Sequence, residues 1–190
     1  MRTLISIFFL SLSFSAFSQN TPSKEVQIKL ALLAAPEDQR SEATVYSYDG
    51  KLLRKGTNQT VCLGDDPSRE GLSVSSYHIS AQPFMERGWA LRREGKDFQE
   101  VFDTREAEAK AGKLQLPDQG SVLHALTADE ADVNWATGEA QNTYTRSVVY
   151  IPWATAESTG LPLKPAGPGL PWIMDPGTHR AHIMINPPRN

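Results

Sequence analysis

The chain has 190 residues, with 19 lysines and arginines against 22 aspartates and glutamates, and a formal net charge of −3. This acidic balance gives no general attraction for nucleic acid or for anionic lipid surfaces, so we expect neither as a charge-driven partner. Residues 19–190 have the size expected of a single globular domain with one core.

The first eighteen residues have the pattern of a cleavable secretory signal peptide. Arg2 supplies one positive charge, an uncharged run from Leu4 to Phe14 follows, and Ala16 and Ser18 form a small-x-small cleavage motif. The apolar run is shorter than the ~20 residues that span a bilayer. We therefore predict cleavage between Ser18 and Gln19 and a periplasmic or secreted protein.

Cys62 is the single cysteine of the chain. It does not lie at the predicted new N-terminus, so we expect no lipoprotein anchor and no membrane insertion after cleavage. One cysteine also allows no internal disulfide, which leaves stability to the core. The unpaired thiol is a candidate reactive group. Its alternative interpretation is a small buried hydrophobe.

Strand patterns dominate the first part of the exported region. Val26–Ala35 fits either a strand or a short helix stopped by Pro36. Asp49-Gly50 then supplies the positive φ angles of a tight hairpin turn. The sequence predicts this hairpin and two further strands, at Ala43–Tyr48, Lys51–Arg54, Thr60–Leu63 and Leu72–Ile79.

Helical spacing replaces the strand pattern after these segments. Phe84, Gly88 and Leu91 recur along one helix, which Gly95 ends. Asp97 and Glu100 have the spacing of a capping box and predict the start of a second helix. Gly112 is the expected residue beyond its end. One face of this second helix is marked by Phe98, Val101, Phe102, Arg105 and Ala109.

The remaining segments are predicted as strands, one polar excursion and an ordered extended loop. The terminal hairpin has Pro176 and Gly177 where a type II turn places them. In chain order we expect strand Ser121–Leu126, excursion Thr127–Asn142, strand Tyr144–Ile151, helical turn Thr155–Thr159, the Pro- and Gly-rich loop Leu161–Pro171, and a hairpin of Trp172–Met174 and His179–Asn186 around Asp175–Thr178.

Strands, two helices and further strands follow one another in this order. The order predicts an α+β fold with a mainly antiparallel sheet and the two central helices packed on one side. It is similar to the element order of PAS domains and profilins.

The spacing of His179 and His182 raises the question of a metal site. Residues three apart in a strand point to opposite faces, so both imidazoles reach one ion only if His179 still belongs to the turn. We therefore predict no metal site and keep these two histidines as weak candidates. His78 ends a strand just before a helix, a place that often borders a pocket. His124 lies within a strand and is interpreted as structural.

Two regions resemble a group of uncharacterised exported bacterial proteins. The central region contains CLGDDP, YH and PFMERG, and the C-terminal region contains PWIMDPGTHRAHIMI. The resemblance implies an exported single domain and brings no activity with it. It adds interest to residues that lie within these regions or between them, namely His78, Glu157, Asp175, His179, Arg180 and His182.

A binding domain for a small ligand or partner is the function that the sequence favours. No catalytic or phosphate-binding motif of a known reaction class occurs in the chain, and no cofactor is indicated. A long Pro/Gly loop flanked by tryptophans is costly to order unless it covers something. We expect a pocket between the sheet and Leu161–Pro171, near His78, Trp153, Trp172 and His179.

Two alternatives stay open at this point. One is a hydrolase, either metal-dependent through His179 and His182 with Asp175, or using Cys62 with a histidine as nucleophile and base. The other is a cell-envelope module that binds a protein partner.

Overall fold

The computed structural model describes residues 22–189. The predicted signal peptide, its cleavage point and the lipid-anchor question lie outside the described residues. Within them, one eight-stranded sheet has the order β2-β1-β3-β4-β5-β8-β10-β9. Neighbouring strands are antiparallel except for the parallel pair β1 and β3. No helix between Pro22 and Arg189 is long and apolar enough to cross a membrane.

The predicted strands are present at nearly the predicted positions. The Asp49-Gly50 hairpin joins β1 and β2, and Gly50 has a φ of 85° as its turn requires. The polar excursion contains a separate short hairpin, β6 with β7. The bounds are β1 Thr44–Tyr46, β2 Leu52–Arg54, β3 Thr60–Leu63, β4 Leu72–His78, β5 Val122–Ala128, β6 Val133–Asn134, β7 Glu139–Ala140, β8 Tyr144–Tyr150, β9 Trp172–Met174 and β10 His182–Ile185.

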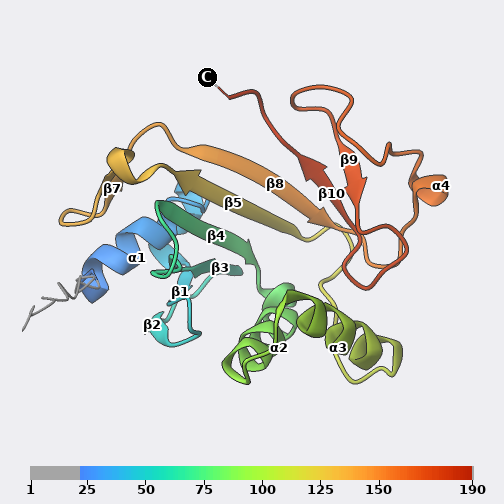
Figure 1. Cartoon of the computed structure of the whole chain (residues 1–190). Coiled ribbons are helices and arrows are strands. Elements are labelled where there is room, and N and C mark those ends of the chain that lie inside the picture. The colour runs from blue at the N-terminus through green and yellow to red at the C-terminus, as the bar shows by residue number, and fades with distance from the viewer. Residues whose placement is uncertain (1–21, 190) are drawn as a thin grey trace, which may run out of the picture.

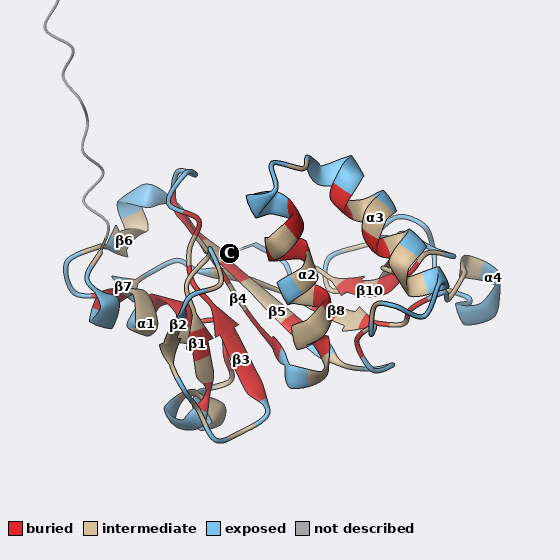
Figure 2. Ribbon diagram, turned by 90° about the horizontal axis from the view of Figure 1, so that it is seen from below, coloured by how far each residue is buried: buried red, intermediate tan, exposed pale blue. Residues whose placement is uncertain are grey.

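The two central helices, α2 (Gln82–Arg93) and α3 (Phe98–Lys110), pack on one side of the sheet, as the sequence predicted (Figure 1). Their contact with the sheet is a cluster in which Phe84 and Trp89 meet Tyr77, Leu123 and Tyr150. Figure 2 marks the buried residues of these helices and of the central strands in red. The predicted α+β fold with a mainly antiparallel sheet is therefore confirmed.

Helix α1 (Lys24–Leu32) resolves the ambiguity of the first apolar segment in favour of a helix. The Ser23 hydroxyl accepts a hydrogen bond from the Val26 amide and caps its start. Val26 and Leu30 pack with Leu72 and Val74 of β4, whose side chains point away from the α2–α3 side. Helix α1 therefore covers the opposite face of the sheet.

Helix α3 begins and ends where the sequence indicated. The Asp97 carboxylate accepts from the Glu100 amide at 2.8 Å, and the Glu100 carboxylate accepts from the Asp97 amide at 2.9 Å. Gly112 follows the helix with a φ of 68°. The reciprocal cap fixes which residues of α3 face inward, and these include Val101 and Arg105.

The C-terminal hairpin differs from the prediction at its turn. The type II turn is present, with Gly177 at a φ of 77° and the Thr178 amide donating to the Asp175 carbonyl at 3.3 Å. A second turn follows, because the Ala181 amide donates back to the Thr178 carbonyl at 3.2 Å. Strand β10 therefore begins at His182, and the prediction that the strand starts at His179 was wrong.

The segment between β8 and β9 contains one short helix, α4 (Ala156–Thr159), and then the predicted loop Leu161–Pro171, without helix or strand. Backbone hydrogen bonds connect this loop to the terminal hairpin. The Ile173 amide donates to the Pro162 carbonyl at 3.0 Å, and the Gly169 amide donates to the Asn186 carbonyl at 2.6 Å.

Candidate functional site

A cavity of about 310 Å³ lies where α2 and α3 meet the ends of β8 and β10. We call it the arginine cavity. None of the described residues that line it is acidic, whereas four carry a positive charge. Its lining consists of Phe84, Met85, Arg92, Lys96, Phe98, Val101, Arg105, Tyr150 and Arg180. Such a concentration of one sign of charge on an acidic protein indicates a site for anions.

Arg105 is the most unusual residue of the arginine cavity, because only 8% of its surface is exposed. Its guanidinium carbon lies 3.9 Å from the centre of the Phe84 ring, and its Nη1 donates to the Phe84 carbonyl at 3.3 Å. Its Nε is buried without a hydrogen-bond partner among the described residues. Burial, and then repulsion by Arg180, lowers the pKa of Arg105 to about 10, so the side chain stays charged at neutral pH.

The other three cations have different surroundings. Arg180 lies in the turn before β10, with its Nε 3.4 Å from the Asp175 carboxylate. Lys96 lies 3.8 Å from the Glu100 carboxylate. Arg92 has its guanidinium 5.9 Å from the Tyr48 ring centre. Across residues 22–189, neither Arg92 nor Arg105 forms an ion pair.

Tyr150, the last residue of β8, adds a hydroxyl to this wall of the cavity. Burial raises its pKa, and the charges of Arg180 and Arg105 oppose that rise only in part. The phenol therefore remains protonated at neutral pH and is available as a hydrogen-bond donor.

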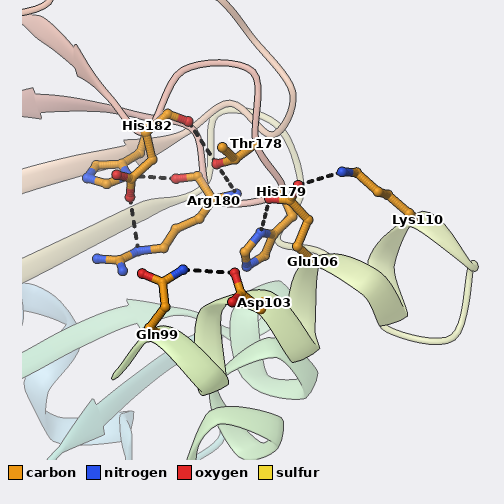
Figure 3. Close-up of polar contacts among 9 residues, drawn as sticks. Gln99, Asp103, Glu106, Lys110, Thr178, His179, Arg180 and His182 are labelled. Atoms are coloured by element: carbon orange, nitrogen blue, oxygen red, sulfur yellow. Dashed lines mark hydrogen bonds and ion pairs between the residues drawn. The ribbon is translucent and has the colours of Figure 1, made fainter. Parts of the chain in front are cut away.

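His179 lies beside the arginine cavity and is completely buried. Its Nδ1 is 3.1 Å from a carboxylate oxygen of Glu106, which also pairs with Lys110 (Figure 3). Its ring centre lies 4.8 Å from that of Phe102 and 6.5 Å from that of Trp153. Burial lowers the pKa of His179 and the Glu106 contact opposes it, so the imidazole is a neutral structural link between the turn and α3.

His182 has a different partner. Its Nδ1 donates to the Arg180 carbonyl at 2.7 Å, which fixes the tautomer, and burial lowers its pKa. In Figure 3, His179 points toward Glu106 while His182 lies on the other side of Arg180. His179 does belong to the turn, yet the two imidazoles do not converge. In the range that the structure describes, no group of three or more histidine, cysteine or acidic side chains is arranged to hold a metal ion.

The remaining candidates from the sequence lie apart from the arginine cavity, and among the described residues that line it Arg180 is the one member of the predicted set. His78 is exposed at the end of β4, where it contacts Ser80 and lines an open groove that also contains His124. Glu157 is exposed on α4. Trp172 is half-buried against the core of the α2–α3 side. Trp153 is 38% exposed and has a positive φ of 68°.

Cys62 is fully buried against α1, among Ala31, Ala35 and Val45. Burial raises the pKa of its thiol to about 12, and the positive charges of nearby arginines lower it by a smaller amount. The thiol is therefore protonated at neutral pH, which is the environment of a packing residue and not of a nucleophile.

Sequence reasoning missed the residues that build the cavity, Phe84, Arg92, Arg105 and Tyr150, as functional candidates. One signal was present, since Arg105 occurs on the same helical face as Val101 and Phe102. A charged residue on an apolar helix face is rarely buried without a partner. That placement alone marked Arg105 for attention.

The sequence matches no protein-family model, and neither a curated protein nor a solved structure matches this chain.

Proposed function

We propose that this protein is a binding protein for a small organic anion, which it takes up in the arginine cavity. The observation that carries the proposal is Arg105, a buried charged side chain whose Nε has no partner and which has no carboxylate within ion-pair distance among residues 22–189.

Loss of hydration opposes the burial of the Arg105 guanidinium. A buried charge without a counter-ion costs several kcal/mol, and a protein retains one mainly where something else compensates it. A carboxylate or phosphate offers a guanidinium two parallel charge-assisted hydrogen bonds. Tyr150 also lines the cavity, and its protonated hydroxyl is a further hydrogen-bond donor. An anionic ligand therefore supplies the counter-charge that residues 22–189 do not provide to Arg105.

The walls also favour a ligand with an apolar part. Phe84, Met85, Phe98 and Val101 contribute aromatic and aliphatic surface to the same cavity. A volume of about 310 Å³ lies at the lower end of the range for small-molecule sites. We therefore expect a compact organic acid and not a large cofactor.

Isothermal titration of the purified protein with benzoate and with benzamide tests the proposal. The two probes have nearly the same shape and differ in charge, so we expect benzoate to bind and benzamide not to bind. Arg105→Met keeps an apolar chain against Phe84 but removes the charge, and we expect it to lose at least about thirtyfold in benzoate affinity.

Arg87→Met is the matched control for this titration. Arg87 also joins α2 to α3, through the Glu108 carboxylate, but it does not line the arginine cavity. We expect this variant to bind benzoate as the parent does. Equal binding of benzoate and benzamide, or full retention of benzoate binding by Arg105→Met, would remove the basis of the proposal.

We also propose that binding takes place outside the cytoplasm, on the basis of the secretory pattern in the first eighteen residues. N-terminal sequencing of the protein recovered from the cell envelope or medium is the test, and we expect it to begin at Gln19. An intact Met1 in the recovered protein would contradict export by cleavage.

The alternative of a hydrolase that uses Cys62 as its nucleophile is not supported, because the thiol is buried and its pKa is about 12. The alternative of an envelope protein partner is favoured if organic anions do not bind, because the cationic rim of the same cavity would then face an acidic surface of that partner.

A further inference from the structure

The four cations of the arginine cavity divide into two pairs. Lys96 and Arg180 each have a carboxylate of the protein within 4 Å, from Glu100 and Asp175 respectively. Arg92 and Arg105 form no ion pair among residues 22–189. Within the described part of the chain, two positive charges of this cavity, and not one, therefore have no counter-ion.

These two unpaired cations belong to different environments. Arg105 comes from the inner face of α3 and is buried, whereas Arg92 is exposed in the last turn of α2. Both line the same cavity. A ligand with two acidic groups places one charge at the desolvated Arg105 and the other at the solvent-exposed Arg92.

We propose that the ligand is an organic dianion, with two separated acidic groups joined by a compact apolar or aromatic middle. This inference rests on the proposed function and specifies the class of anion. One acidic group meets Arg105 and the Tyr150 hydroxyl, and the second meets Arg92. A dicarboxylate and a carboxylate with a phosphate both satisfy this shared chemistry.

The middle of the ligand is matched by the aromatic residue at the start of α3. Phe98 lines the cavity, and its exposed fraction of 70% is the largest among the large apolar side chains of the described residues. The guanidinium of Arg180 lies 5.2 Å from the centre of its ring and holds one side of it. A ring or short aliphatic chain that packs on Phe98 would join the two acidic groups of the proposed ligand.

Titration with benzoate and terephthalate tests the inference, because terephthalate adds a second carboxylate across the same ring. We expect the parent protein to bind terephthalate about threefold to fivefold more tightly than benzoate at low salt, the range for an exposed ion pair. High salt should reduce this advantage. A third probe, 4-carboxyphenyl phosphate, carries a phosphate in place of the second carboxylate. Its affinity relative to that of terephthalate shows whether the site prefers a phosphate or a dicarboxylate.

Arg92→Gln identifies the second contact. In this variant the ratio of terephthalate to benzoate affinity should fall to no more than the statistical advantage of two equivalent carboxylates, and this ratio, not the benzoate affinity alone, reports the second contact. Arg93→Gln is the matched control, since Arg93 occupies the same last turn of α2 and does not line the cavity. A cation in that turn interacts with the helix dipole in either position, so the control removes this shared contribution.

The outcomes separate the two proposals. Equal affinity of the parent for both probes, or an unchanged terephthalate advantage in Arg92→Gln, overturns the dianion inference and leaves anion binding intact. Failure of both probes to bind the parent overturns the proposed function itself.

Discussion

The two faces of the sheet bury different kinds of side chain. Under α1 the core is built from small and aliphatic residues, with Cys62, Ala31 and Val45 at its centre. On the side of α2 and α3, the buried residues include Arg105 and His182, and His179 lies against the same helices. The α1 side therefore depends on apolar packing, whereas the α2–α3 side also buries polar groups, of which His179 links the turn to α3 and Arg105 has no counter-ion among residues 22–189.

A charge introduced into the apolar core on the α1 side should cause the largest loss of stability. We expect Cys62→Asp to lower the free energy of unfolding by at least about 3 kcal/mol, because its surroundings are apolar and the nearby Arg40 and Arg54 already donate to backbone carbonyls. Urea denaturation at pH 7 measures this loss. Cys62→Ala is the control for the lost sulfur volume and should cost far less.

Arg105→Met is the complementary change on the other side. Replacing a buried charge by an apolar chain of similar volume is often neutral or stabilising, so we expect an unfolding free energy within about 1 kcal/mol of the parent, or above it. A loss as large as that of Cys62→Asp would show that Arg105 serves the fold and not a ligand.

The link between His179 and α3 gives the second largest effect. Glu106→Ala leaves both ring nitrogens of the buried His179 without a partner in the described range. We expect a loss of about 1.5–3 kcal/mol in the free energy of unfolding. Lys110→Ala removes the exposed partner of the same carboxylate and should cost less than about 1 kcal/mol. Both changes gain the same helix propensity of alanine, so equal losses would contradict a structural role for the His179 contact.

The order of the elements was predictable because it rests on local signals. The Asp49-Gly50 turn and the capping box of Asp97 and Glu100 each use residues that are neighbours in sequence. The start of β10 was not predictable, because the extra turn depends on the Trp153 amide, which donates to the Thr178 carbonyl from another part of the chain. Local pattern favours a strand at His179, and long-range pairing overrides it.

The site was predictable only in part for the same reason. Arg180 was singled out from the terminal motif and does line the arginine cavity. Its companions Arg105, Arg92 and Tyr150 lie on three different elements that meet only after α2 and α3 pack on the sheet. A lone arginine in a helical pattern gives no sign of whether its charge has a partner, since that depends on this packing.

Acid should destabilise the α2–α3 side in particular. The pKa of His182 is lowered by burial, so the unfolded state binds the proton more readily than the folded state does. Stability from this group is fully present above the unfolded pKa of about 6.5 and is lost as the pH falls below it. We expect each such histidine to change the free energy of unfolding by at most about 1.4 kcal/mol per pH unit.

Urea denaturation of the parent and of His182→Asn between pH 5 and 7.5 measures this contribution. Asparagine can still donate to the Arg180 carbonyl but does not titrate, so the variant should show a shallower loss of stability below pH 6.5. A parallel pH dependence in the two proteins would mean that other groups, such as the half-buried His124 whose pKa burial also lowers, account for the acid sensitivity.

The smallest effect on stability should come from Phe98, and it distinguishes a binding surface from a structural one. Its side chain is 70% exposed, so Phe98→Ala should change the free energy of unfolding by less than about 0.5 kcal/mol. The same variant should bind terephthalate about threefold more weakly, because the ring that covers the middle of the ligand is lost. Urea denaturation and terephthalate titration of the parent and of Phe98→Ala measure these two effects. Unchanged affinity would confine the ligand to the buried end of the cavity, around Arg105 and Tyr150, and would leave the exposed aromatic at the start of α3 without a part in binding.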